Sequence, residues 1–92
     1  MINSLAQVKL HLRLSSLDTS EDSLLLAYMA AAEEQIANHL DRVDIPRNAS
    51  IKAASLLFIG ELYEHREASS EVQISEHPAI VRLLSPYRIL GI

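Results

Sequence analysis

Apolar residues recur every three or four positions over much of the chain, which is the spacing of amphipathic α-helices. The longest such stretch extends from about residue 21 to residue 40 and places on one face Leu25, Met29, Ala32, Ile36 and Leu40. We expect Thr19 or Ser20 to cap this helix, because their hydroxyl groups accept hydrogen bonds from the first backbone N–H groups. Glu21 and Asp22 would then place negative charge at the positive end of the helix dipole.

A shorter helix is predicted at the start of the chain, from Leu5 to about Leu12. Ser4, followed by Gln7 three residues later, forms the pattern of a capping box. The next eight residues, 13–20, are rich in Ser, Thr and Asp, whose side chains compete for backbone hydrogen bonds and favour turns. This segment is therefore expected to be a loop between the first two helices.

The third predicted helix starts between Pro46 and Ala49 and extends to about Ala68. Between residues 53 and 59 it is apolar on almost every side, which indicates a central helix covered on several faces. Gly60 lies within the same helix, where glycine costs about 1 kcal/mol relative to alanine. We therefore expect another helix to cross close to Gly60.

The C-terminal quarter of the chain is less regular. Residues 69–77 permit a short strand or an extended loop, because two apolar residues alternate with polar ones. Pro78 suits the first turn of a short fourth helix that ends near Leu84. An apolar tail follows and ends in Ile89-Leu90-Gly91-Ile92.

Composition supports a helical fold. Of 92 residues, 49% are apolar, whereas two Gly and three Pro are too few for the turns of a hairpin-rich β protein. The expected fold is all-α, a small bundle of about four helices with two long central helices and a short C-terminal helix plus tail. At this length we expect residues 1–92 to form a single domain.

The charge pattern excludes several classes of partner. The formal charge is −4, and the eight Lys and Arg residues are scattered, so neither sequence-specific nucleic-acid binding nor attachment to an anionic membrane is expected. A helix-turn-helix is disfavoured because the third helix offers only Lys52 before its apolar run. No apolar stretch is long enough to span a bilayer, and the chain has no Cys for thiol chemistry.

One polar cluster could suggest a metal or acid–base site, namely Glu61, Glu64, His65 and Glu67. Glu61 and His65 are spaced to share one helix face. However, the chain has no second motif to complete a coordination sphere, and His11, His39 and His77 are isolated. We therefore interpret the cluster as a solvated helix end, and expect no catalytic residues, no metal site, no cofactor and no enzyme activity.

Five short motifs occur in order along the chain. The first reads L-x-x-V-K-x-x-L-R-L and starts at Leu5. The second combines the acidic Glu21-Asp22, the leucines Leu24 to Leu26 and the later Ala31-Ala32-Glu33. The other three are I-K-A-A from Ile51, L-Y-E-H-R-E from Leu62 and L-L-S-P-Y-R from Leu83. In this order they resemble the phage head-tail connector family, whose members are also described as adaptor, head-completion or DNA-packaging proteins of tailed phages and prophages. Leu62 and His65 depart from the pattern, where the family commonly has an aromatic residue and Asn.

The resemblance implies a structural subunit of a ring of about a dozen copies. Such a ring would dock on the portal protein, extend the DNA channel and present a surface to a downstream head-completion or tail protein. Its location would be the head–tail junction of the virion, after assembly in the bacterial cytoplasm. An acidic subunit suits a channel through which DNA must slide.

Five C-terminal residues are expected at the subunit or portal interface, because Arg and aromatic residues are typical interface anchors and an apolar tail needs a surface to cover it. They are Arg66, Tyr87, Arg88, Ile89 and Leu90. The alternative is that the tail packs on its own helices. A different functional class, a small acidic helical regulator or protein-binding module acting as monomer or dimer, also fits the composition.

Overall fold

Four α-helices form the molecule in the computed structural model, which describes residues 2–41, 44–65 and 73–87. The helices are α1 (Leu5–His11), α2 (Asp22–Leu40), α3 (Ala49–Glu64) and α4 (Pro78–Leu84). Two short 3-10 helices, η2 (Ile74–Glu76) and η3 (Ser85–Tyr87), flank α4. The described residues contain no strand, so the predicted all-α bundle with two long central helices is confirmed.

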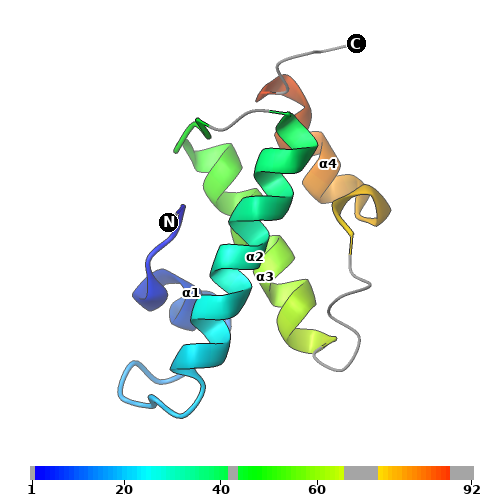
Figure 1. Cartoon of the computed structure of the whole chain (residues 1–92). Coiled ribbons are helices and arrows are strands. Elements are labelled where there is room, and N and C mark those ends of the chain that lie inside the picture. The colour runs from blue at the N-terminus through cyan, green and yellow to red at the C-terminus, as the bar shows by residue number, and fades with distance from the viewer. Residues whose placement is uncertain (1, 42–43, 66–72, 88–92) are drawn as a thin grey trace.

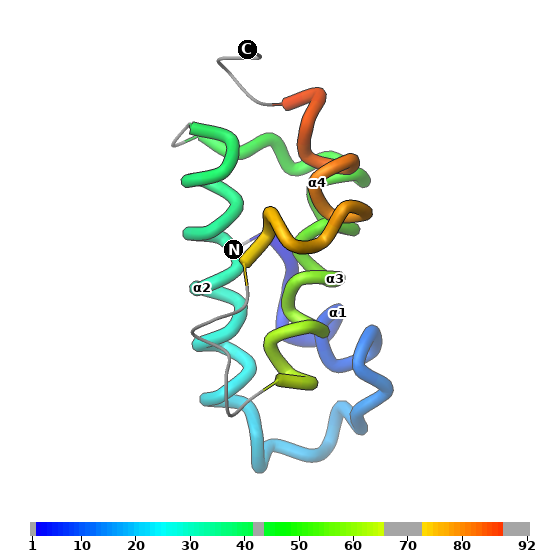
Figure 2. The backbone as a smooth tube through the Cα atoms, turned by 90° about the vertical axis from the view of Figure 1, so that its right-hand side faces the viewer, coloured from blue at the N-terminus to red at the C-terminus, as the bar shows by residue number. Residues whose placement is uncertain are grey.

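The two long helices, α2 and α3, run antiparallel beside each other and carry the rest of the fold (Figure 1). The short α1 packs against both of them near the start of α2. At the other end, α4 packs against α3, as the turned view in Figure 2 also shows. The molecule therefore has α1 and α4 at opposite ends of a central helical pair.

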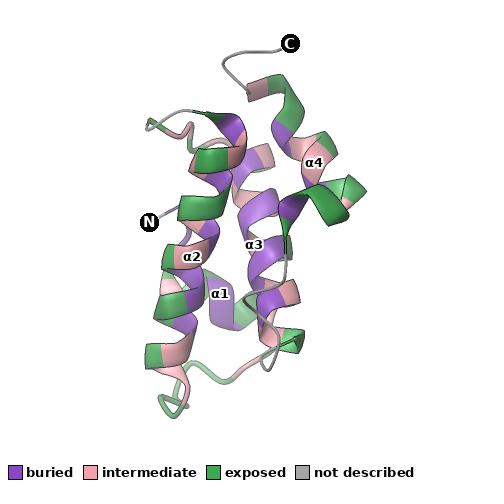
Figure 3. Ribbon diagram, turned by 45° about the vertical axis from the view of Figure 1, so that its right-hand side comes forward, coloured by how far each residue is buried: buried purple, intermediate pink, exposed green. Residues whose placement is uncertain are grey.

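The core lies between the facing sides of these helices (Figure 3). All five residues of the apolar face predicted for α2 are buried, and Tyr28 joins them. Burying a large aliphatic or aromatic side chain contributes about 1.5–3 kcal/mol, so the most completely buried side chains dominate the stability. These are Phe58, Leu25, Ile36, Leu40, Ile51, Ile59, Leu84 and Val8.

Two of the predicted helix starts are confirmed in detail. The Ser4 hydroxyl accepts a hydrogen bond from the Gln7 backbone N–H at 3.2 Å, and the Gln7 side chain accepts one from the Ser4 N–H at 2.9 Å. Pro78 occupies the first turn of α4, where its missing N–H costs nothing. These local signals succeed because they depend only on neighbouring residues.

The predicted cap of α2 is wrong. Glu21 occupies the N-cap position and makes no side-chain capping hydrogen bond. The Ser20 hydroxyl instead donates to Asp18 Oδ1 at 2.7 Å, and the Ser20 backbone N–H donates to the same oxygen at 3.0 Å. Ser20 therefore makes its hydrogen bonds within a local turn centred on Asp18 and does not cap the helix.

The third helix differs from its prediction at its end. It begins at Ala49, with the Asn48 side chain accepting from the Ile51 N–H at 3.0 Å, and it ends at Glu64. His65 leaves the helical conformation with φ −111° and ψ 45°. The predicted end at Ala68 lies outside the described residues, as do residues 66–72 in general.

Two further expectations are met only in part. A Cβ on Gly60 would lie 3.7 Å from His11 Nε2, which is ordinary van der Waals contact. The helix crossing there is with α1, and it does not require glycine. The sequence permits a short strand or an extended loop over residues 69–77. Within the described part, 73–77, a 3-10 helix over Ile74–Glu76 lies between the extended residues Gln73 and His77, and Ile74 is buried in the core.

Candidate assembly surfaces

Of the five predicted interface residues, the structure places Tyr87. It lies in η3, directly after α4, and its partly buried side chain packs against the core. This contact ties the start of the tail to its own domain. The other four, Arg66, Arg88, Ile89 and Leu90, lie outside the described residues, and their interface role stays a prediction.

Lys9 links α1 to the beginning of α2 from a buried position. Its ammonium Nζ lies 2.7 Å from Asp22 Oδ1 and donates to the Asp18 backbone carbonyl at 2.8 Å. Asp22 Oδ1 is itself shielded from solvent, and no hydrogen bond of good geometry reaches it from the described residues. The charge of Lys9 is therefore what compensates this carboxylate oxygen, because a buried charge needs a partner.

Asp18 contributes to the same loop through its side chain. The two hydrogen bonds from Ser20, first the backbone N–H and then the hydroxyl, lower the pKa of the Asp18 carboxyl, since both stabilise its charged form. The nearby Lys9 charge acts in the same direction. The loop between α1 and α2 is thus organised around one lysine and one aspartate.

A second link joins the start of α2 to the end of α3. The Tyr63 hydroxyl donates to Glu21 Oε1 at 2.6 Å, across 42 positions of sequence. A hydrogen bond to a charged acceptor is short and strong. It fixes the antiparallel pairing of the two long helices at the end of the molecule where α1 also packs.

The I-K-A-A motif at the start of α3 divides between core and surface. Ile51 and Ala54 are buried, whereas Lys52 is partly exposed. The Lys52 backbone carbonyl accepts a hydrogen bond from Asn3 Nδ2 at 3.2 Å, which holds the segment before α1 against α3. The motif therefore secures a helix contact while leaving its lysine side chain at the surface.

The polar cluster at the end of α3 brings a histidine and a carboxylate into contact. His65 Nε2 lies 3.5 Å from Glu61 Oε2, as the helical spacing predicts, and His65 is largely exposed. Among the described residues no group of three or more His, Cys, Asp or Glu is arranged to hold a metal ion. Glu67 lies outside those residues. An exposed pair of this kind supports a helix end modestly.

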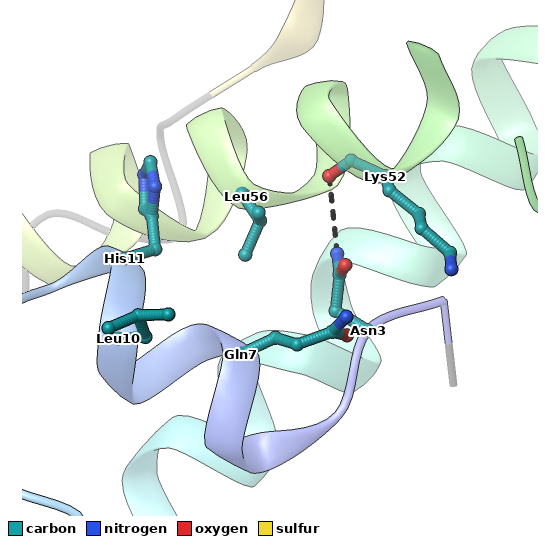
Figure 4. A pocket seen from close by; sticks show the side chains of 6 residues that line it. All are labelled: Asn3, Gln7, Leu10, His11, Lys52 and Leu56. Atoms are coloured by element: carbon teal, nitrogen blue, oxygen red, sulfur yellow. Dashed lines mark hydrogen bonds between the residues drawn. The ribbon is translucent and has the colours of Figure 1, made fainter. Parts of the chain in front are cut away.

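A cavity of about 300 Å³ opens between α1 and α3 (Figure 4). We call it the α1–α3 groove; its lining residues are Asn3, Gln7, Leu10, His11, Lys52 and Leu56. The lining includes the cation Lys52 and the titratable His11 but no carboxylate. The sequence patterns give no sign of this groove, because it depends on how α1 lies across α3.

Two leucines near α1 are unusually exposed. Leu10 in α1 retains 79% of its surface, and Leu17 in the following loop retains 90%. Single exposed leucines are common, but Leu10 also borders the α1–α3 groove. The end of the molecule that carries α1 therefore offers apolar surface that its own core does not cover.

Residues 2–88 match the family described as phage gp6-like head-tail connector protein. The chain belongs to this family. The family membership predicted from the order of the five motifs is thereby confirmed.

This connector-family chain also resembles a curated relative. It is 34% identical over 77 residues to head completion protein gp6 of Enterobacteria phage HK97, an alignment that covers 77% of this chain and 69% of the relative. No solved structure matches the chain. Within the described residues, no helix of this connector protein has both the length and the apolar character needed to cross a bilayer.

The structure gives physical roles to several motif residues of this connector protein. Val8 fills the core, Lys9 compensates Asp22, and Tyr63 bonds Glu21. These residues stabilise the fold of the chain.

Proposed function

We propose that this connector-family chain is a structural subunit of a ring of about a dozen copies that closes the head of a phage or prophage particle. The ring docks on the portal protein, continues the DNA channel and receives a downstream head-completion or tail protein. The observation that carries the proposal is the family match over residues 2–88. The relative's name, head completion protein, supports the same stage of assembly.

The surface of the subunit supports an assembly role. Leu10 and Leu17 present apolar side chains to solvent at one end of the molecule, where a neighbouring protein would cover them in an assembly. The net charge of −4 suits a channel wall, because a basic lumen would bind the phosphates of passing DNA. The site of action is then the head–tail junction, reached from the bacterial cytoplasm where the particle is built.

The C-terminal residues remain our proposed contact with a neighbouring subunit or the portal. Tyr87 anchors the start of this segment on the core, and Arg66, Arg88, Ile89 and Leu90 supply the charged and apolar groups of the contact. Replacing Arg88→Glu, or deleting residues 89–92, should weaken ring formation or portal binding. If both variants assemble and bind like the parent chain, the tail has no interface role.

Native mass spectrometry of the concentrated protein, with negative-stain imaging of the same sample, tests the ring directly. Closed rings of about a dozen subunits support the proposal. If the chain is monomeric alone, the same measurement is repeated with the portal protein of its phage, on which the ring would close. A tight dimer that does not bind the portal protein would contradict the proposal and favour a small acidic regulator.

A further inference from the structure

The α1–α3 groove has the character of a docking site. Leu10, 79% exposed, stands at one end beside His11, and Lys52 stands at the other end with Asn3 (Figure 4). Leu56 lies between them on α3. One end of the groove thus carries the exposed Leu10 beside an imidazole, and the other end carries the Lys52 ammonium group. An occupant that matches it needs an apolar side chain at one end and a carboxylate at the other.

The exposed side of α2 carries that pattern. We call it the α2 face; it comprises Leu26, Ala27, Ala30 and Glu34, all exposed. Leu26, Ala30 and Glu34 are four residues apart in turn, so they share one side of the helix. Leu26 and Glu34 are separated by eight residues, or about 12 Å along the axis. The alanines between them allow another backbone to approach closely.

These two surfaces point in different directions. The α2 face is opposite the buried stripe through which α2 packs on the other helices. In Figure 4, α1 and α3 form the walls of the groove and α2 lies behind them. A surface on α2 that faces away from the core therefore cannot reach the groove of its own chain. It is available only to a partner outside its own chain.

We infer that the α1–α3 groove receives the α2 face of a second copy of this chain. Leu26 packs beside Leu10, Ala30 crosses the middle of the groove near Leu56, and Glu34 pairs with Lys52. The charges are complementary, because the groove lining has no carboxylate. Of the two adjacent glutamates on α2, Glu33 pairs with Arg47 of its own chain at 3.6 Å. We therefore assign the contact with Lys52 to the exposed Glu34.

The inferred contact has a consequence for symmetry. The groove and the α2 face are different surfaces, so the contact is heterologous and each copy can bind two neighbours. Repeated with a closing rotation, such a contact generates a ring. The inference rests on the proposed ring function and specifies which surfaces of the subunit make the ring.

Cysteine cross-linking tests the contact cleanly, because the chain has no Cys of its own. We would combine Leu10→Cys with Leu26→Cys in one chain and treat it with a short bis-maleimide, both alone and bound to the portal. Both positions are exposed, so the fold should tolerate them, and circular dichroism checks this. A covalent ladder of trimers and higher rungs is expected, because every copy carries both halves of the contact.

The matched control replaces the groove position with the loop leucine, combining Leu17→Cys with Leu26→Cys. Leu17 is more exposed than Leu10 but does not line the groove, so its ladder should be at least about tenfold weaker, since only a formed contact raises the local thiol concentration. Each single variant should stop at a dimer or below. Efficient dimerisation of Leu10→Cys alone would indicate a groove-to-groove contact and overturn the inference.

Charge reversal adds a second test. Lys52→Glu should slow ladder formation about two- to fivefold, the effect of losing a surface ion pair, and adding Glu34→Lys should restore it. Rings seen by native mass spectrometry without a Leu10–Leu26 ladder would refute this contact while leaving the ring function intact. If no ladder forms with the protein alone or with the protein bound to the portal, the contact is refuted. Whether the chain binds the portal then tests the proposed connector function separately.

Discussion

The buried lysine of α1 offers the sharpest test of how this small fold is held together. Lys9→Met removes the ammonium that lies 2.7 Å from Asp22 Oδ1 and bonds the Asp18 carbonyl, while keeping most of the apolar stem. The carboxylate oxygen of Asp22 would then be shielded from water without a compensating charge. We expect a large loss of stability from this single change.

The size of the loss follows from the exposure of the two partners. Removing one partner of a buried ion pair costs about 3–5 kcal/mol. The Lys9 side chain is 7% exposed, but that of Asp22 is 28% exposed, so water can partly solvate the carboxylate left behind. We therefore expect a loss of about 2–3 kcal/mol. Against a total of about 5–14 kcal/mol for a chain of this length, this is a substantial fraction.

Urea and thermal unfolding followed by circular dichroism would measure the effect, in dilute protein so that assembly does not contribute. The melting temperature should fall by about 10–20 °C. The chain's other lysine provides the control, since Lys52 is partly exposed and Lys52→Met should change stability by less than about 0.5 kcal/mol.

A double-mutant cycle with Asp22→Asn isolates the pair itself, because it subtracts the separate effects of each substitution. A coupling energy of about 1 kcal/mol or more is expected between Lys9 and Asp22. A coupling near zero, or a Lys9→Met variant as stable as Lys52→Met, would show that the reasoning from burial and distance is wrong.

Three further predictions concern single contacts. Tyr63→Phe removes the 2.6 Å hydrogen bond to Glu21 and should lower the free energy of unfolding by about 1 kcal/mol; an unchanged urea midpoint would contradict it. Gly60→Ala should raise stability by about 0.5–1 kcal/mol, because the added methyl meets only ordinary contact and the helix gains propensity; a lower melting temperature would reveal a tight crossing instead. The lowered pKa of Asp18 makes a contribution to stability that is present above the unfolded-state pKa and disappears as the pH falls through the folded-state pKa. Ser20→Ala removes the hydroxyl bond but keeps the backbone N–H bond, so it should move the pKa of Asp18 partway up toward its ordinary range in an NMR titration; a pKa that does not move would argue against the hydroxyl as one of its causes.

The sequence predicted those parts of the fold that depend on short-range patterns. The Ser4–Gln7 capping box, the buried face of α2 and Pro78 at the start of α4 are each encoded within a few residues. The predicted cap of α2 is wrong because the Ser20 hydroxyl donates a hydrogen bond to Asp18 instead of accepting one from the first N–H groups of the helix. That choice between two local hydrogen-bonding arrangements is not determined by residue preference alone.

The surfaces were harder to predict than the helices. Lys9 was recognised only as part of a motif, because its partner lies beyond a loop and its burial depends on how α1 packs. The α1–α3 groove likewise joins Gln7 to Leu56, nearly fifty residues apart in sequence. Four of the five predicted interface residues lie outside the described part of the chain, and Tyr87 alone has been placed.

The chain's two lysines differ in a way that makes them chemical reporters. The Lys9 amine is buried in an ion pair, whereas Lys52 borders an open groove. An amine-reactive label read out by mass spectrometry should therefore modify Lys52 readily and Lys9 only when the fold opens. Loss of labelling at Lys52 with Lys9 still protected would mark occupation of the groove, and gain of labelling at Lys9 would mark unfolding. One footprinting experiment thus separates the assembly of this protein from its denaturation.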